Sequence, residues 1–222
     1  MHSETALLFL ALAWSRPPAL NQAMISFRDA KAAARRRKQA VRVLHLHLAL
    51  RGVEPRVWRR MVVRDTLWLA RLHDAIQIAF GWFDYQLHRF TVNDAGYGNP
   101  VNRENELVIE DDRDFSLRDL EVAPKETFLY EYFFGEGWQV EIRVEKAEPA
   151  VAGTKYPLIL DGKHNGPPED CGGPDGFKEV LHSFKHPDEP LSKEWLEWLG
   201  EGYDPAEFDV AKLNKALARL PK

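Results

Sequence analysis

Residues 127–146 read TFLYEYFFGEGWQVEIRVEK, and this stretch decides the fold of the chain. Two β-prone runs, Thr127 to Phe134 and Trp138 to Lys146, flank the connection Gly135-Glu136-Gly137. Glycines in a three-residue connection supply the positive φ angles that a bulged hairpin needs. The stretch therefore predicts an antiparallel hairpin, and we expect its aromatic side chains chiefly in core and cross-strand packing.

Further strands are expected on both sides of this hairpin. Residues 41–50 alternate with period two and place four leucines on one face, which predicts a half-buried strand. The other runs that read as strands are Trp58 to Arg64, Leu87 to Val92 and Tyr156 to Leu160. Residues 93–100 are rich in turn formers, and residues 104–119 read as an acidic surface loop.

One helix is expected between the early strands, and three follow the last strand. Leu69, Leu72, Ile76 and Phe80 recur at helical spacing, Asp65 or Thr66 can cap the helix, and Gly81 can end it. The late helical segments are residues 177–185, 192–199 and 209–220. This distribution favours an α+β fold, with a mostly antiparallel mixed sheet from the first two thirds, one early helix packed on it and C-terminal helices.

Composition bounds the class of protein. A chain of 222 residues with 45% hydrophobic and 29% charged residues predicts one globular domain, which we place at residues 41–220 behind a leader of residues 1–40. No apolar run reaches the roughly 20 residues that cross a bilayer, so no contact with a membrane is expected. A single cysteine fits a reducing compartment, and we expect the cytoplasm.

The leader is basic although the chain carries a net charge of −4. Its basic arm consists of Arg35, Arg36, Arg37 and Lys38. A solvated helical arm is one interpretation, and contact with nucleic acid through phosphate neutralisation is the other. Translation from Met24 instead of Met1 would remove much of the leader.

The motifs of common chemistries are absent from the sequence. It contains no glycine-rich phosphate loop, no His-Glu-x-x-His and no nucleophile elbow. The remaining constellation is Cys171 beside Glu169 and Asp170, whose carboxylates would raise the pKa of the thiol and disfavour a nucleophile. One alternative is a divalent metal held by these residues with the distant His88. The other is a rigid loop whose carboxylates cap backbone amides.

Separated blocks of the sequence carry a family resemblance. They are residues 57–60, 72–77, 81–90, 130–138, 167–173, 198–200 and 203–205, which include Pro167-Pro168-Glu169-Asp170-Cys171-Gly172-Gly173. In order and spacing they resemble the plasmid pRiA4b ORF-3-like family, also labelled TnpR-like passenger proteins of an insertion element. The resemblance implies an α+β fold without an established activity. It adds Trp58, Arg59 and Trp138 to the candidate functional residues.

The chain departs from the family pattern at several polar positions. The family carries aspartate at Phe133, histidine at Gln86, histidine near Val140 and cysteine at Gly166. Two alternatives follow from the resemblance: the chain is a variant with a depleted site, or the feature that the family shares is structural. The TnpR-like label suggests a resolvase, but none of the six serines lies among the arginines that such chemistry needs.

We therefore favour a non-catalytic binding or accessory domain, linked by its family to mobile elements. Its partner is left open between a protein and nucleic acid bound through the basic leader. The first alternative is a metal-dependent enzyme with a site near His88 and residues 169–171. The second is a nucleic-acid-associated protein that uses the basic arm. No cofactor is expected apart from the divalent metal of the first alternative.

Overall fold

The computed structural model describes residues 40–99, 109–132 and 137–221. The chain divides into two units, Met1–Gln39 and Ala40–Lys222, and every described residue belongs to the second. The basic arm and the connection at residues 133–136 lie outside the described residues. The predictions made for them stay predictions.

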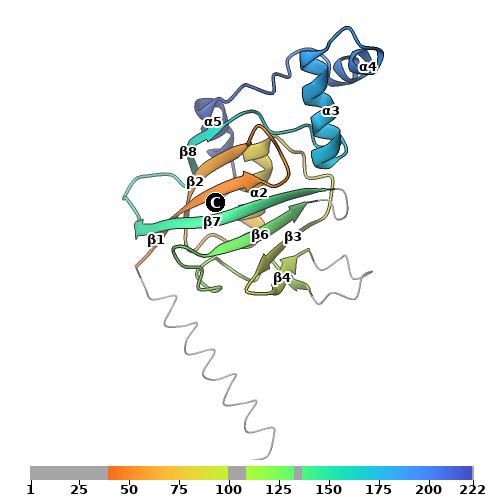
Figure 1. Cartoon of the computed structure of the whole chain (residues 1–222). Helices are drawn as coiled ribbons and strands as arrows, with labels where there is room; N and C mark the ends of the chain where they lie inside the picture. The colour runs from red at the N-terminus through yellow and green to blue at the C-terminus, as the bar shows by residue number, and fades with distance from the viewer. Residues whose placement is uncertain (1–39, 100–108, 133–136, 222) are drawn as a thin grey trace, which may run out of the picture. The chain divides into compact units, whose positions relative to one another are not determined.

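A single sheet forms the frame of this unit (Figure 1). Its strand order is β5-β4-β3-β6-β7-β1-β2-β8, and neighbouring strands are antiparallel except for the parallel pair β4 and β5. The strands are β1 (Arg42–Leu50), β2 (Trp58–Arg64), β3 (His88–Val92), β4 (Ala95–Gly98), β5 (Ile109–Asp111), β6 (Thr127–Tyr132), β7 (Trp138–Pro149) and β8 (Leu158–Lys163).

The hairpin predicted from residues 127–146 is confirmed and lies at the centre of the sheet. Strands β6 and β7 pair from Thr127 opposite Arg143 to Tyr132 opposite Trp138. Their inward side chains Tyr130, Tyr132 and Trp138 are at most 1% exposed. The aromatic residues of the hairpin that the structure describes are therefore core residues, as the sequence indicates.

Two segments predicted as turn and loop contain short strands instead. Residues 95–98 form β4, so the turn after β3 shrinks to Asn93 and Asp94, both of which have positive φ. Residues 109–111 form β5 at the sheet edge. Glycine and acidic residues weaken the strand signal in the sequence, and the pairing of β4 with β3 and of β5 with β4 outweighs it in the folded chain.

The early helix, α2 (Leu69–Phe80), buries the predicted stripe against the sheet. Gly81 ends it with a φ of 78°, and the Trp82 N–H donates to the carbonyl of Gln77 in a Schellman motif. The helix begins later than the sequence suggests: its N-cap is Trp68, and neither Asp65 nor Thr66 caps it. The Asp65 carboxylate instead pairs with Arg118 at 2.7 Å.

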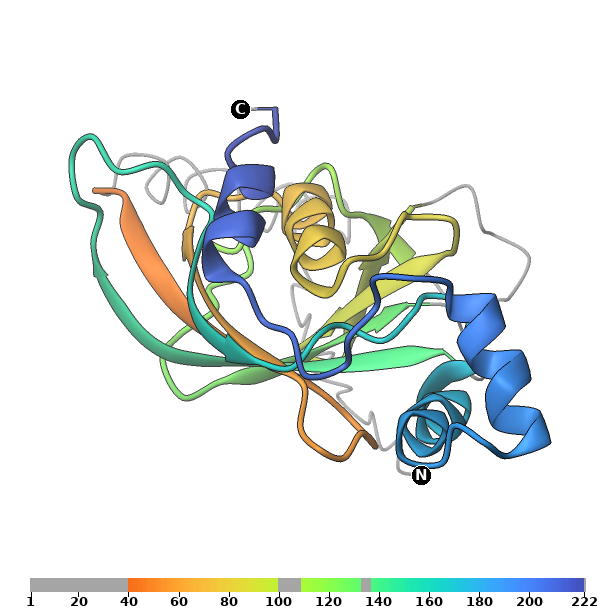
Figure 2. The same ribbon diagram turned by 90° about the horizontal axis from the view of Figure 1, so that it is seen from above.

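Three helices follow the sheet, α3 (Gly173–Lys185), α4 (Pro190–Leu199) and α5 (Val210–Leu217). Helix α5 packs on β8 and lies beside α2 (Figure 2), whereas α3 and α4 pack on each other. Among the described residues, no helix is long and apolar enough to cross a membrane. The arrangement confirms the α+β class predicted from the sequence.

Candidate metal centre

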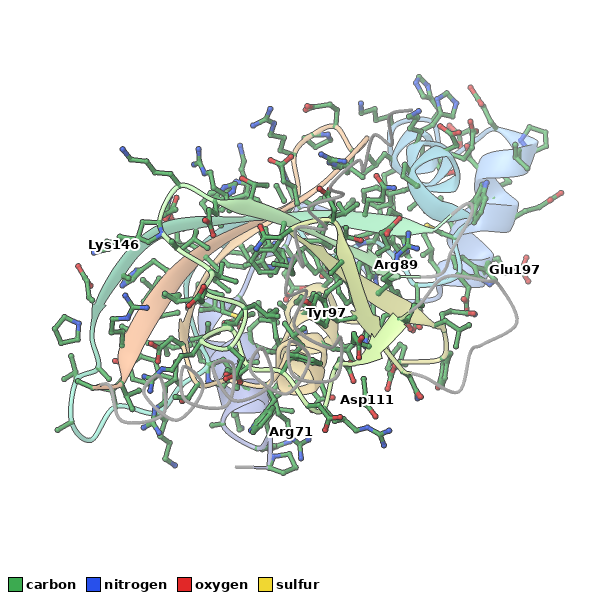
Figure 3. The ribbon with its side chains drawn as sticks, turned by 90° about the horizontal axis from the view of Figure 1, so that it is seen from below. Arg71, Arg89, Tyr97, Asp111, Lys146 and Glu197 are labelled. Atoms are coloured by element: carbon green, nitrogen blue, oxygen red, sulfur yellow. The ribbon has the colours of Figure 1, made fainter. Side chains whose placement is uncertain are left out.

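A pocket opens where α2, the 82–87 loop, β3 and the segment after β5 meet. Its volume is about 580 Å³. Arg71 of α2 lines it, and Figure 3 labels Arg71 apart from Glu197 of α4 in this view. No residue of α3 or α4 is among the described residues that line the pocket.

Three potential metal ligands meet in this pocket. His73 comes from α2, Asp84 from the 82–87 loop and His88 from the first position of β3. One ligand atom of each residue lies within 4.8 Å of the other two. The imidazole rings of His73 and His88 stack with centroids 3.6 Å apart. Two imidazoles and a carboxylate are a donor set that first-row transition metals such as zinc and iron prefer.

Both histidines are held by further side chains. Nδ1 of His73 is hydrogen-bonded to the Tyr130 hydroxyl at 2.8 Å, and its Nε2 lies 2.9 Å from Oδ1 of Asp84. Nε2 of His88 lies 2.7 Å from Oδ2 of Asp112, whose side chain is 4% exposed. A metal-ligating histidine usually holds its second nitrogen in this way, which fixes the direction of the ring.

The loop that carries Asp84 is held by side chains from three other places. The Glu169 carboxylate accepts from the N–H of Phe83 at 2.7 Å and from the N–H of Tyr85 at 3.2 Å. The Asp84 N–H donates to the side-chain carbonyl of Gln77 at 3.0 Å. The N–H of Gln86 donates to the Tyr132 hydroxyl at 3.2 Å.

These contacts satisfy four consecutive backbone donors that form no regular secondary structure. Asp84 has a φ of 60°, a conformation that non-glycine residues seldom adopt. The Tyr132 hydroxyl also donates to Glu169, which is itself buried. The side chains of Gln77, Tyr132 and Glu169 therefore fix the backbone at Asp84.

Burial shapes the electrostatics of the pocket. Desolvation, with a smaller contribution from His88, lowers the pKa of His73 to about 3, so its ring is neutral at pH 7. Desolvation also raises the pKa of Asp84 above its ordinary value. The side chain of Asp84 is 58% exposed, so this desolvation is partial. A neutral imidazole and a carboxylate that faces the pocket can both donate to a bound cation.

Three protein ligands leave coordination positions open toward the pocket. Structural zinc sites are closed by four protein ligands, whereas sites with three keep a position for water or another molecule. The arrangement therefore suits an ion that a small molecule can reach.

Residues 169–171 contribute to the pocket differently from the sequence prediction. In the part of the chain that the structure describes, the group of potential metal ligands that contains His88 consists of His73, Asp84 and His88. Glu169, Asp170 and Cys171 do not belong to this group. The Glu169 carboxylate is occupied by the loop, and Asp170 is exposed. Cys171 is 1% exposed, and burial raises the pKa of its thiol to about 12. The expectation that these carboxylates cap backbone amides fits Glu169.

The other candidate residues lie in the core or on the sheet. Trp138 is buried and donates its indole N–H to the carbonyl of Glu169 at 3.2 Å. Arg59 is 2% exposed, donates to three backbone carbonyls and lies over the Phe80 and Phe208 rings. Trp58 stacks on His47. These three residues support the fold and do not line the pocket.

Two departures from the family pattern can be located. Gln86 lines the pocket, so the histidine that the resemblance implies there would face the same space. Gly166 lies against the backbone of Phe80, where a Cβ would overlap the Phe80 carbonyl. No cysteine fits at Gly166 in this backbone.

The sequence pattern identifies neither His73, Asp84 nor Asp112 as a ligand. The position of His73 beside the apolar stripe of α2 instead indicates a structural, hydrogen-bonded histidine, and its contacts with Tyr130 and Asp84 agree with that. Asp112 was grouped with its acidic neighbours as a solvated loop, yet its side chain is buried beside His88. The retrievable signal is the close sequence spacing of His73, Asp84 and His88 around the helix stop at Gly81. That spacing fits no common ligand motif, so it carries little weight alone.

The fold and pocket define an α+β protein with an open candidate metal centre. The family model for the plasmid pRiA4b ORF-3-like protein matches residues 42–212, and the chain belongs to this family. It is 38% identical over 179 residues to the uncharacterized protein y4hQ of Sinorhizobium fredii, covering 80% of this chain and 92% of that protein. It also resembles the crystal structure of the protein of unknown function MM3350 from Methanosarcina mazei, with a TM-score of 0.68 and 34% identity, over 78% of this chain and 98% of that one.

Proposed function

We propose that this protein is a binding domain that holds one divalent transition-metal ion through His73, Asp84 and His88 and presents it to a small molecule. The observation that carries the proposal is the convergence of these three ligands on one pocket. The preference for a binding role comes from the absence of common catalytic motifs in the sequence. The link to mobile elements and an accessory role remain expectations from the family resemblance.

The surroundings of the ligands support the proposal. Tyr130 and Asp112 orient the two imidazoles, and Glu169 fixes the backbone beside the carboxylate. Such second contacts typically change metal affinity or activity by about 10- to 100-fold when they are removed.

The second candidate is a metal-dependent enzyme, which the open coordination positions favour. An ion there would lower the pKa of a bound water and polarise an oxygen of a bound molecule. The residues of the chain would hold the ion and orient its ligands. Metal-dependent turnover in a screen of hydrolysable substrates would select this candidate over the binding role.

The test is metal analysis of full-length protein purified without a histidine tag. We expect about one equivalent of zinc or another first-row metal after equilibration and dialysis, and calorimetric binding of added Zn²⁺. Asp84→Asn and His88→Gln should lose the metal that the wild type retains after dialysis and should bind added Zn²⁺ measurably more weakly, while the circular dichroism spectrum is kept.

The matched control is His182→Gln. Nε2 of His182, on α3, lies 2.9 Å from Oε2 of Glu189, the residue that precedes α4; both side chains are exposed and neither lines the pocket. This variant should leave metal binding unchanged. Absence of stoichiometric metal in the wild type, or equal loss in His182→Gln, would overturn the proposal.

A further inference from the structure

Exposed apolar side chains gather around the mouth of the pocket. Trp68, Tyr85 and Leu87 line it, and their exposed fractions are 43%, 72% and 44%. Phe83, which is 69% exposed, stacks on Tyr85 with ring centroids 5.8 Å apart. We call these four residues the apolar rim.

The backbone of the rim is held in place at Phe83 and Tyr85, although the side chains of these residues face solvent. The N–H groups of Phe83 and Tyr85 both donate to the buried carboxylate of Glu169. Two exposed aromatic rings on a clamped backbone stabilise the core little, because a side chain gains free energy from burial only where water is removed. Exposed apolar side chains that gather at the mouth of a pocket favour a binding site there.

The charges of the lining indicate what the rim surrounds. Asp74, Asp84 and Asp112 against Arg71 and Arg113 leave the lining with one net negative charge when both histidines are neutral. A divalent ion at His73, Asp84 and His88 reverses this to one net positive charge. The metal-loaded pocket therefore attracts an anionic group that coordinates the ion, and the metal-free pocket does not.

We infer that the ligand is a small molecule with an anionic oxygen-donor head, which coordinates the metal, and a flat apolar body, which packs against the rim. This inference rests on the proposed metal-binding function. A pocket of about 580 Å³ is in the range that binds drug-sized molecules. Aromatic rings favour offset stacking on Trp and Tyr, which makes an aromatic body the best match.

The experiment compares two probes with the same head, benzohydroxamate and acetohydroxamate, on the zinc-loaded full chain by calorimetry. Because both heads chelate alike, the ratio of their affinities reports the apolar body alone. We expect benzohydroxamate to bind at least about tenfold more tightly, and neither probe to bind the metal-free protein. Tyr85→Ala and Trp68→Ala should reduce the ratio to below about threefold without changing zinc affinity.

The matched control is Trp198→Ala, since Trp198 is 52% exposed on α4 and lies outside the pocket lining. It should leave the ratio unchanged. If the protein binds zinc but binds both probes with equal affinity, or binds neither probe, this inference is wrong. The proposed metal-binding function would still stand in that case. Failure to bind zinc would overturn both.

Discussion

The carboxylate of Glu169 binds the backbone on both sides of Asp84. It accepts from the residue before Asp84 and from the residue after it, at 2.7 and 3.2 Å. Glu169 belongs to the Pro167–Gly173 loop that marks the family, whereas Asp84 belongs to the candidate metal centre. The loop is therefore connected to the pocket by a structural contact, although it contributes no ligand to the metal cluster of the described residues.

Replacement of Glu169 should weaken metal binding through Asp84. In Glu169→Gln the side chain keeps one acceptor oxygen for two backbone donors and Tyr132, so the loop relaxes and zinc affinity should fall about tenfold. If Glu169 acts only by placing Asp84, the double variant Asp84→Asn/Glu169→Gln should bind zinc no more weakly than Asp84→Asn alone.

The control for this cycle is Asp170→Asn, which changes the exposed neighbour of Glu169. Its zinc affinity should equal that of the wild type. Fully additive losses in the double variant would show that Glu169 acts on the site by another route.

Asp112 should matter for metal binding because it orients His88. Asp112→Asn keeps the shape of the side chain but removes the charge that supports the imidazole at 2.7 Å. We expect zinc affinity to fall by about 10- to 100-fold, measured by competition with a chelating dye. Glu189→Gln, in the exposed pair with His182, should have no effect. An unchanged affinity in Asp112→Asn would remove Asp112 from the site.

Cys171 should be unreactive in the folded protein. Its thiol is buried and its pKa is raised to about 12, so almost no thiolate exists at pH 8. Alkylation by iodoacetamide should be slow in buffer and complete within minutes in denaturant, followed by mass spectrometry. Cys171→Ser should also retain zinc binding. Fast labelling of the native protein, or loss of zinc in Cys171→Ser, would contradict this assignment.

Arg59 should contribute to stability and not to the site. Its guanidinium donates to the carbonyls of Trp58, Ala79 and Lys163, and burial lowers its pKa to about 10, which leaves it charged at pH 7. Arg59→Met leaves these acceptors without partners, so the free energy of unfolding should fall by roughly 2–4 kcal/mol in urea titrations. Zinc stoichiometry of the folded variant should stay at one. A loss below about 0.5 kcal/mol would show that the carbonyls find other donors.

The sequence predicts the frame of the fold because local signals agree with tertiary packing there. The pairing of β6 with β7 and the stripe from Leu69 to Phe80 follow from residue spacing, and the helix stop follows from the positive φ of Gly81. The sequence pattern does not predict β4 and β5, which have four and three residues. Strands this short are stabilised by pairing with their neighbours and carry little local signal.

The candidate site could be predicted only in part, and His88 is the part that was found. Asp84 reaches the pocket because its backbone has a positive φ. Hydrogen bonds to Glu169, which lies 85 positions further along the chain, hold that backbone in place. His73 sits at the edge of an apolar stripe, where a buried structural histidine is the usual outcome. Only the fold brings α2, the loop and β3 to one pocket.

The central claim is that His73, Asp84 and His88 bind one metal ion together. Anomalous diffraction at the zinc edge, from crystals of tag-free protein equilibrated with Zn²⁺, tests it most directly. The account predicts one peak about 2.0–2.2 Å from a nitrogen of each histidine and an oxygen of Asp84. A pocket without a peak, in which His73 still bonds Asp84 and His88 still bonds Asp112, would contradict it.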